Sequence, residues 1–585
     1  MIPRPKMTNW LNPARLMSVG IRAAISTVFG QFADRREAQA AVRPDDPDEA
    51  TRFFRYDEAE PDEDGAFWVD YLADTGDGWN ATYSMAKVLC DPALECGEAG
   101  PLRRGNVLIM GGDQVYPSAS PKDYEERLIA PFRAAADRVS KKEADAGAFG
   151  DLFAIPGNHD WYDGLRAFLG LFCRFSPGLR DGKIIGGRKT RQTRSYFAIK
   201  LPGNWWLWGV DSQLEGYIDQ PQVDYFAQIS KKHMDAKSKL IICTGYPSWT
   251  NVDPADPNPR FGGFSYMERL INNYGRAGGA TGRVRLSISG DIHHYARHIE
   301  DDRHYVTCGG GGAYTHPTSQ LKTERFSWPW PKPGEGRERR HRERKFEIAV
   351  DPATGEESVY PSRVTSNLEA LKVLGLALYN PAFTLLMAAI CWLLLRMILL
   401  DSEASGGDFL SQARAEDGAR LWEMLLFTPW VPVHFWLSVA AYAFIADIKG
   451  RVPKFAIGLV HALAQFLVTV IVGLSVYHWL DGAWFEVRLL VASLCAGFAS
   501  ASLMGLYFLV AFLGCRKHWN EVFAALRLTK YKSMVRMKID KDGSLTLYPI
   551  KLHRAENRRG WRFWRTPGAV TSRTIGLIES PVRIA

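Results

Sequence analysis

The chain has 585 residues, a formal net charge of +8 and 8 cysteines. The cysteines are scattered without paired spacing, which argues against a disulfide-stapled domain and against a zinc site built on Cys pairs. The charge is moderate for this length, and the basic excess gathers in two runs, RERRHRERK and HRAENRRGWRFWR. We expect these runs to meet anionic lipid headgroups rather than nucleic acid, although Trp561 and Trp564 in the second run would suit either partner.

The N-terminal segment predicts an amphipathic helix within residues 1–35. Its sequence NWLNPARLMSVGIRAAISTVFGQFADRRE carries Arg residues inside the apolar pattern, unlike the uninterrupted apolar core of a signal peptide. Such a helix suits a membrane surface, and packing on the neighbouring folded domain is an equal alternative.

Residues 50–365 contain strand-like apolar runs that each lead into a loop with potential metal ligands. The runs and their loop residues are AFWVDYLAD with Asp74, NVLIMGG with Asp113 and Tyr116, LFAIPG with Asn158 and His159, and VRLSISG with Asp291 and His293. Because the carboxyl ends of strands in an α/β sheet converge on a ligand, we expect these side chains to lie together. Their oxygen and nitrogen donors suit a divalent metal.

The residue types suggest a division of roles in a two-metal site. Asp113 suits a carboxylate bridging two ions about 3.5–4 Å apart. Asp74 and His293 would be terminal ligands, and the Asn158 amide oxygen would bind one ion. His159 would contact a phosphate oxygen or protonate a leaving group.

Each of these residues also has a plain structural interpretation. An Asp after a strand is often a helix N-cap, Tyr116 could be a packed aromatic, and His294, His298 and His316 could simply be hydrogen-bonded. The glycine run 309–312 lacks the Lys-Ser/Thr of a nucleotide-binding loop and predicts close packing. What favours a site is the order of the loops taken together.

The motifs GGDQVYP, PGNHDWYDG and SGDIHHY resemble those of the calcineurin-like metallophosphoesterase superfamily, over roughly the first half of the chain. The resemblance implies an α/β fold, a four-layer α/β/β/α sandwich, and hydrolysis by a metal-bound hydroxide. Tyr116 falls where the purple acid phosphatase branch places a metal-binding tyrosinate, and Gly76 replaces the His of the first motif. One metal site would then comprise Asp74, Asp113, Tyr116 and His293.

The second metal site departs from the family pattern. The isolated His of the family aligns with Gly245, and the first His of the last motif is replaced by Asp291. The remaining ligands Asp113, Asn158 and Asp291 are all oxygen donors, which favours Mn²⁺, Mg²⁺ or another hard ion over Zn²⁺ in this site. For the whole centre the resemblance implies two divalent ions, or Fe with a divalent ion, with Mn or Fe expected and Mg as the alternative. The residues that could compensate for the missing His are Thr244, Tyr246, His294 and Asp77.

Residues 373–513 predict four transmembrane helices, since each apolar stretch reaches about 20 residues. The stretches are Val373–Leu400, Leu425–Ile445, Phe455–Leu480 and Leu489–Leu513. We expect Arg396, His461 and His478 near helix ends, where a long or polar side chain reaches the interface.

The connecting loops predict the orientation. DIKGRVPK and CRKHWN are basic, whereas DSEASGGDFLSQARAEDGAR is mainly acidic. By the positive-inside rule, both termini and the catalytic domain face the cytoplasm, and the expected location is a bacterial inner membrane.

Residues 516–585 predict a return to the catalytic domain. SMVRMKIDKDGSLTLYPIKL alternates apolar and polar residues on both sides of Asp542-Gly543, which is typical of a β-hairpin. The membrane bundle would then be an insertion in the catalytic domain.

These features together predict a membrane-anchored metallophosphoesterase that hydrolyses a phosphate ester or anhydride on a small molecule or a lipid. The alternative is a sensor or scaffold that binds a phosphorylated ligand without turnover, favoured by the missing His at Gly245. The hypothesis that the helices transport a substrate is less favoured, because the helices carry no cluster of Asp or Glu.

Overall fold

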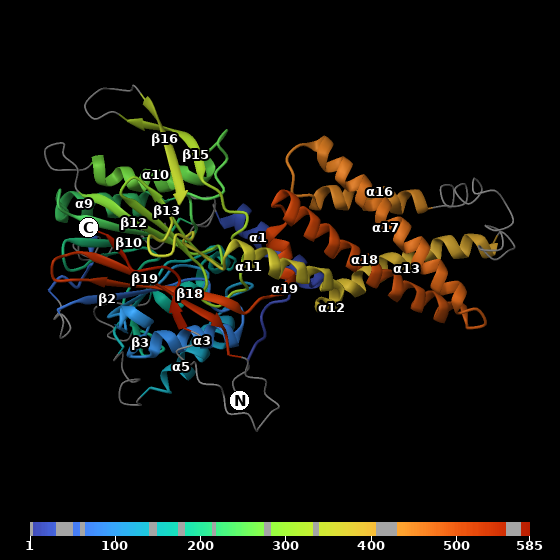
Figure 1. Ribbon diagram of the computed structural model, residues 1–585, viewed down its shortest axis with the longest axis horizontal. Coiled ribbons are helices and arrows are strands. Elements are labelled where there is room, and N and C mark those ends of the chain that lie inside the picture. Colours follow the sequence, from blue (N-terminus) through green and yellow to red (C-terminus); the bar gives the residue numbers. More distant parts are fainter. Residues whose placement is uncertain are drawn as a thin grey trace. The chain divides into compact units, whose positions relative to one another are not determined.

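The computed structural model describes residues 4–30, 51–58, 65–139, 149–173, 182–212, 218–273, 282–331, 339–404, 430–556 and 575–584. They form two compact units (Figure 1). The first comprises residues 1–8, 19–363 and 527–585, and the second comprises residues 9–18 and 364–526. Helix α1 (Pro13–Gly30) forms where the sequence predicts it, and its place at a membrane surface stays a prediction.

The first unit contains two large sheets. The ten-stranded sheet has the order β1 (Phe54–Arg55), β9 (Phe197–Lys200), β10 (Trp205–Val210), β11 (Lys239–Thr244), β12 (Arg283–Ser289), β14 (Arg303–Cys308), β13 (Tyr295–Glu300), β16 (Arg339–Ile348) and β15 (Glu324–Pro331), with β17 (Val359–Tyr360) paired to β13. The nine-stranded sheet has the order β20 (Ile575–Leu577), β19 (Leu545–Arg554), β18 (Lys530–Ile539), β2 (Phe67–Leu72), β5 (Val107–Met110), β6 (Asp151–Ala154), β8 (Arg188–Thr190) and β7 (Ile184–Ile185), with β21 (Val582–Ile584) paired to β19. Strands β3 (Ala93–Glu95) and β4 (Pro101–Arg103) form a separate pair.

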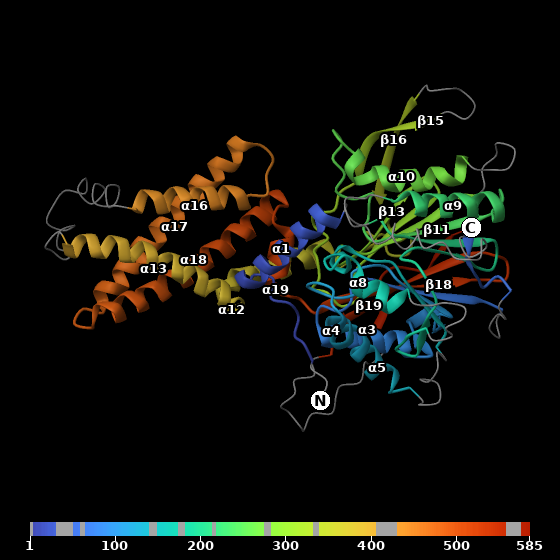
Figure 2. The same ribbon diagram turned by 180° about the vertical axis from the view of Figure 1, so that it is seen from behind.

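Helices lie along both sheets of this unit. Figures 1 and 2 show α9 (Gln220–His233) and α10 (Asn258–Asn273) beside the ten-stranded sheet, and α3 (Trp79–Cys90) and α5 (Ala130–Ala136) beside the nine-stranded sheet. The remaining short helices of the unit are η2 (Gly97–Ala99), α4 (Pro121–Asp123), η3 (Tyr124–Ile129), α7 (Asn158–Trp161) and α8 (Arg166–Phe172).

The core follows from strand alternation, since successive side chains of a strand point to opposite faces. In β2, Val69 and Tyr71 join a buried cluster that contains residues of both sheets, while Trp68 and Leu72 join a cluster shared with the helices on the other face. In β10, Leu207 and Trp208 divide in the same way. The molecule is therefore a mixed α/β protein with two large sheets, and the four-layer family sandwich stays a prediction.

The C-terminal segment takes part in the nine-stranded sheet. Strand β18 pairs antiparallel with both β2 and β19, around the turn at Asp542-Gly543. Its fully buried Arg536 donates to Asp70 Oδ1 of β2 at 2.7 Å, and Arg188 of β8 donates to Asp70 Oδ2 at 3.2 Å. Two guanidinium groups thus compensate one buried carboxylate, which ties the last part of the chain to the first.

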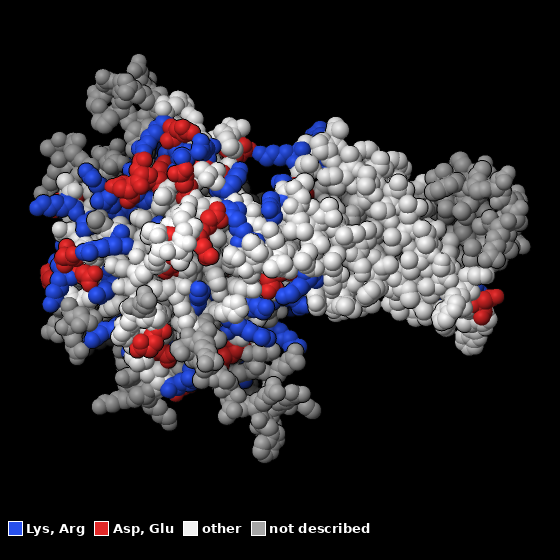
Figure 3. Space-filling model, viewed as in Figure 1, with Lys and Arg blue, Asp and Glu red and all other residues white. Residues whose placement is uncertain are grey.

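The second unit is helical. Its elements are α11 (Arg363–Ala370), η5 (Leu371–Gly375), α12 (Leu376–Tyr379), α13 (Pro381–Ala404), α16 (Val431–Ile445), α17 (Arg451–Trp479), α18 (Phe485–Cys515) and α19 (Trp519–Leu526). In Figure 3 the described surface over α13, α16, α17 and α18 is nearly free of charged side chains. Many large apolar side chains are exposed there, such as Leu385, Phe444, Val460 and Leu490.

The prediction of four membrane spans is wrong for the described residues, in which three helices are long and apolar enough to cross a membrane. They are Pro381–Leu400 within α13, α17 and α18. Helix α16 has only 15 residues, about 22 Å at 1.5 Å per residue, against a hydrocarbon core of about 30 Å. The first part of the predicted span Leu425–Ile445 lies outside the described residues, and Pro432 stands in the first turn of α16, where a proline is tolerated.

The first span also begins later than predicted. Residues 371–379 form the short helices η5 and α12, and α13 starts at Pro381 instead of continuing from Val373. Proline lacks a backbone N–H and disfavours helical geometry at the residue before it, here Asn380. Most of the acidic loop used to predict orientation, as well as Trp561 and Trp564, lies outside the described residues, so the orientation stays a prediction.

Candidate metal centre

Three of the predicted aspartates stand directly beyond strands and share an unusual backbone conformation. Asp74 follows β2, Asp113 follows β5 and Asp291 follows β12, with φ angles of 58°, 51° and 67°. Asp adopts this left-handed region more readily than most residues, yet each such residue still costs of order 1 kcal/mol. Backbone strain of this kind clusters at functional sites. Here it occurs at three aspartates that follow strands of both sheets.

The loops approach one another through glycine. A Cβ atom on Gly157 would lie 2.0 Å from Asp113 Oδ1 and 2.4 Å from Asp113 N, so only glycine fits there. A Cβ on Gly112 would lie 3.3 Å from Gly157 Cα and 3.4 Å from Gly245 Cα. The loops after β5, β6 and β11 therefore meet backbone to backbone.

Three predicted ligands converge on the hydroxyl of a fourth, Tyr116. Its oxygen lies 2.8 Å from Asp74 Oδ1, 3.1 Å from Asp113 Oδ2 and 3.0 Å from His293 Nε2. Asp74 Oδ1 and His293 Nε2 are 3.6 Å apart. All four side chains are buried. The structure thus brings together Asp74, Asp113, Tyr116 and His293, the set predicted to form one metal site.

The donor chemistry of this cluster fits a divalent ion. Donor atoms at 2.0–2.1 Å from an octahedral ion lie about 3 Å from one another, close to the separations around Tyr116. His293 Nδ1–H donates to Tyr314 O at 2.7 Å, which leaves Nε2 as the acceptor of the neutral ring. In the described part of the chain no three His, Cys, Asp or Glu side chains are grouped as a metal site on their own. The phenol of Tyr116 lies among Asp74, Asp113 and His293 and is the fourth member of the set.

In the described part of the chain, Asp74 and Asp113 form no ion pair with a Lys or Arg side chain. Burial, followed by the charges of Asp113 and Asp291, raises the pKa of Asp74 well above its usual value. Burial, with the charge of Asp291, raises the pKa of Asp113 to about 8. Burial also raises the pKa of Asp291. A cation held among these groups would favour their ionised forms, and this is the electrostatic condition of a metal site.

The predicted second-site residues border the same cluster but are less buried. The backbone N–H of Asp291 donates to both oxygens of Asp74 at 3.1 and 2.9 Å. The Asn158 amide oxygen accepts the His159 N–H at 3.1 Å, and that N–H also donates to Asp113 Oδ1 at 2.9 Å. Asn158, His159 and Asp291 are each partly exposed. We call the side of the cluster that carries these partly exposed residues its open side.

The candidates for replacing the missing His are mostly engaged elsewhere. Thr244 Oγ1 donates to Tyr246 O at 3.0 Å, and the Tyr246 hydroxyl donates to Arg260 O at 3.3 Å. Asp77 accepts the Thr8 N–H at 2.8 Å. His294 Nδ1 donates to Pro317 O at 2.8 Å. Among the described residues, His294 Nε2 and Asp77 Oδ2 have no hydrogen-bond partner.

Asp160, the last residue of GNHD, braces two of the site loops. Its carboxylate accepts the N–H of Gly157 at 2.9 Å and of Gln114 at 3.2 Å, and the Tyr124 hydroxyl at 2.5 Å. One fully buried side chain thus holds the loop of Asp113 against the loop of Asn158.

Arg260 and Lys532 are functional candidates that sequence reasoning missed. Arg260, near the start of α10, stacks over the Tyr246 ring at 4.8 Å and opposes the rise in the pKa of Asp291. Lys532 of β18 donates to Ala313 O, and to Thr315 Oγ1 at 3.1 Å. Burial lowers the pKa of Lys532 to about 7, while Asp77 and Asp74 oppose this shift. No local motif marks either residue, because both approach the site from distant segments.

Residues of the loop after β14 hold His293 in place through ring stacking and a hydrogen bond. The imidazoles of His316 and His293 stack with centroids 4.0 Å apart, and the His293 N–H donates to His316 Nδ1 at 3.0 Å. The Ala313 N–H donates to Asp74 O at 2.9 Å, and the Thr315 N–H to Leu528 O at 3.2 Å. His316 is therefore a hydrogen-bonded support of the cluster.

Comparison with known proteins gives little further guidance. No protein-family model matches the chain, and no curated protein matches it significantly. One similar solved structure is GAP50, the anchor in the inner membrane complex of Plasmodium, with 13% identity and a TM-score of 0.30 over 43% of this chain and 74% of that chain. Another is PhoD, with 12% identity and a TM-score of 0.26 over 43% of this chain and 58% of that chain. Scores this low carry no weight in the assignment that follows.

Proposed function

We propose that the chain is a metal-dependent phosphoester hydrolase anchored in a membrane, as the motifs between Asp74 and His293 suggest. The observation that carries the proposal is the convergence of Asp74, Asp113 and His293 on the Tyr116 hydroxyl, at the edge where strands of both sheets end. Asp74 and Asp113 are buried and have no ion-paired Lys or Arg among the described residues, so they favour a bound cation, and phosphate is a ligand that cations bind.

The protein side of the mechanism follows from these positions. Asp74, Asp113, Tyr116 and His293 would hold one ion, and Asp113, Asn158 and Asp291 would hold the other. When bound, divalent Mn, Fe or Mg ions would supply an activated water and neutralise the phosphate oxygens. Tyr116 must lose its proton to act as a ligand, and a cation held beside its hydroxyl would favour that ionised form.

His159 is the residue we assign to proton donation. Its Nδ1–H donates to Pro117 O at 2.8 Å, which orients the ring and makes Nε2 the atom that exchanges a proton. Burial lowers the pKa of His159, while the charges of Asp291 and Asp77 oppose that shift. In its protonated form, such a ring is acidic enough to give the Nε2 proton to a departing alkoxide.

Arg260 is the residue we assign to binding a phosphate oxygen on the open side. Replacing Arg260 by Gln should lower kcat/KM for a phosphate ester on the order of 10-fold, because a hydrogen bond to a charged group contributes about 1.5–3 kcal/mol. Arg260→Lys should restore part of the loss. Steady-state kinetics check this, with Arg133→Gln as the exposed control. Unchanged kinetics in Arg260→Gln would remove Arg260 from the site.

The proposed substrate class follows from the helices that could anchor the protein in a membrane and from the metal ions that the site would hold. A phosphate ester or anhydride on a lipid or small molecule is the class we propose, since three helices able to cross a membrane would hold the site near a bilayer. A bacterial inner membrane with the hydrolase domain in the cytoplasm is the placement that the basic loops favour.

A sensor that binds a phosphorylated ligand without turnover is the second candidate. The observation in its favour is Gly245, which offers no donor atom where the family pattern has a His, while Thr244 and Tyr246 are engaged with other groups. A second ion would then be held by three oxygen donors only.

The deciding experiment is hydrolysis by the full-length protein in detergent, stripped with a chelator and reloaded with Mn²⁺, Fe²⁺ or Mg²⁺. We expect turnover of 4-nitrophenyl phosphate or bis(4-nitrophenyl) phosphate that disappears on stripping and returns on reloading. Metal content measured on the same samples separates the alternatives. Two ions with turnover support the hydrolase, bound metal without turnover of either ester supports the sensor, and absence of metal binding contradicts both.

A further inference from the structure

Helices α16 and α17 each carry a row of polar side chains through an otherwise apolar sequence. On α16 the row is His434, Ser438 and Tyr442, and on α17 it is His461, Gln465 and Thr469. Residues four apart lie on one face of an α-helix, so each row forms a polar stripe along its helix. Polar side chains at membrane depth are costly and are usually kept for a function.

The two stripes face each other. The helices follow one another through a short connection at residues 446–450, so the chain direction reverses and each step of four along α16 is matched by a step of four back along α17. The rings of Tyr442 and His461 are in contact, with centroids 4.3 Å apart and planes tilted by 52°. His461 is therefore buried within the bundle, 6% exposed, and the prediction that it sits near a helix end is wrong.

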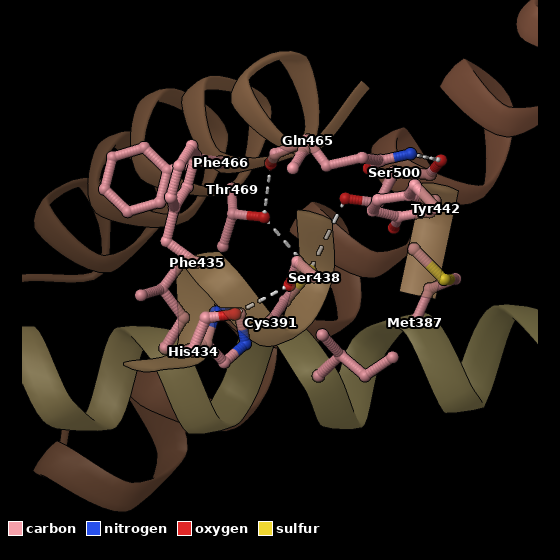
Figure 4. Close-up of a pocket in the computed structure, with 13 residues that line it drawn as sticks. Met387, Cys391, His434, Phe435, Ser438, Tyr442, Gln465, Phe466, Thr469 and Ser500 are labelled. Atoms are coloured by element: carbon pink, nitrogen blue, oxygen red, sulfur yellow. Dashed lines mark hydrogen bonds between the residues drawn. The ribbon is translucent and has the colours of Figure 1, made fainter. Parts of the chain in front are cut away.

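A pocket lies between the stripes (Figure 4). Its lining residues are Met387, Ile390, Cys391, Leu394, His434, Phe435, Ser438, Tyr442, Ala462, Gln465, Phe466, Thr469 and Ser500. The space inside that admits a water-sized sphere is about 20 Å³, and the whole hollow with its open part is about 320 Å³. The inner space fits one oxygen-sized group, since a single water needs about 10–15 Å³ on this measure.

One hydrogen-bond acceptor in this pocket lacks a partner. The Gln465 amide N–H donates to Ser500 O at 3.1 Å, which fixes the orientation of the amide. Among the described residues Gln465 Oε1 has no partner, although the residue is only 6% exposed. Its neighbours are paired, since Thr469 Oγ1 donates to Gln465 O at 2.8 Å and lies 3.3 Å from Cys391 Sγ. A buried carbonyl left unpaired costs on the order of a few kcal/mol.

We propose that this pocket binds the hydroxyl group of a neutral, long-chain alcohol-type lipid. The hydroxyl donates to Gln465 Oε1, and its hydrocarbon chain leaves along the apolar side of the pocket, against side chains such as Leu394 and Phe466. None of the lining residues is Asp, Glu, Lys or Arg, so the pocket offers no partner for a charged headgroup. This binding site is independent of the metal cluster and of hydrolysis.

The proposal is tested by photolabelling of the full-length protein in lipid nanodiscs. The probe is hexadecanol with a diazirine near the hydroxyl, compared with the same diazirine chain lacking the hydroxyl. Peptides that contain residues 434–442 or 461–469 should be labelled by the alcohol about 5-fold more than by the alkane, the ratio for one hydrogen bond of about 1 kcal/mol. Unlabelled hexadecanol should compete this labelling away.

A matched pair of variants locates the acceptor. Gln465→Leu should reduce labelling by the alcohol to the level of the alkane, and Ser502→Ala, at a partly exposed position of α18 that does not line the pocket, should leave it unchanged. Equal labelling by the two probes in wild-type protein, or labelling that unlabelled hexadecanol does not compete, would overturn the proposal. The competition in wild-type protein decides the matter even if Gln465→Leu fails to fold.

Discussion

Replacing Asp113 by Asn is expected to lower kcat/KM for phosphoester hydrolysis on the order of 10³-fold. The Asp113 carboxylate belongs to both predicted metal sites. Its Oδ2 lies 3.1 Å from the Tyr116 hydroxyl, and its Oδ1 accepts the His159 N–H at 2.9 Å. The amide of Asn keeps the shape but lacks the charge that a bridge between two ions requires. Loss of a single preorganised electrostatic group already costs about 10²–10³ in rate.

The measurement pairs steady-state kinetics with metal content. Asp302→Asn is the control, because it makes the same chemical change at an exposed carboxylate whose partner is Arg285. The variant should lose bound metal together with activity, whereas the control should keep both. Wild-type rates in Asp113→Asn would show that hydrolysis takes place elsewhere in the chain.

The central part of the candidate site could be predicted from the sequence because its signals are local. Asp74, Asp113 and Asp291 each follow an apolar run that forms a strand, and a glycine stands directly before Asp113 and Asp291. Strand, tight turn and donor are encoded within about eight residues, and the parallel arrangement of the strands then brings the donors together. The left-handed backbone at all three aspartates is the structural counterpart of these short loops.

The supporting residues could not be predicted, because their positions depend on distant contacts. Lys532 lies far along the chain from Asp74, yet β18 pairs directly with β2, and this pairing carries Lys532 to the loop of Ala313. Arg260 has no motif around it and reaches the open side only because α10 begins close to Tyr246. A pattern within one segment contains no information on which other segment will be its neighbour.

The helical unit shows a second reason why the sequence alone was insufficient. Hydropathy identified the apolar stretches, but it could not show that Pro381 starts a new helix or that α16 is shorter than a bilayer. Hydropathy also treated His461 as an exception at a helix end. The i, i+4, i+8 spacing of His461 with Gln465 and Thr469 was the available signal, and its meaning became clear only beside the matching stripe of α16.

Replacing Gly157 by Ala is expected to lower metal affinity and kcat/KM on the order of 10²-fold, the second largest effect. The new methyl group would lie 2.0 Å from Asp113 Oδ1 and 2.4 Å from its backbone nitrogen, so the two loops must separate. A displacement of about 1 Å at a reacting centre can cost about 10²-fold in rate. Kinetics and metal titration on the purified variant check this.

A suitable control for Gly157→Ala is Gly20→Ala, since a Cβ at position 20 would meet no atom within 4 Å. Both variants add one methyl group, so a difference between them reports the contact with Asp113 and not the loss of glycine itself. If the loops separate as expected, added metal should recover part of the activity of Gly157→Ala, because binding energy can draw the donors together again. Asp113→Asn should show no such recovery, because its missing charge cannot be restored by concentration. If added metal fails to recover activity in Gly157→Ala as it does in Asp113→Asn, the position of the Asp113 carboxylate, and not only its charge, is indispensable to the reaction.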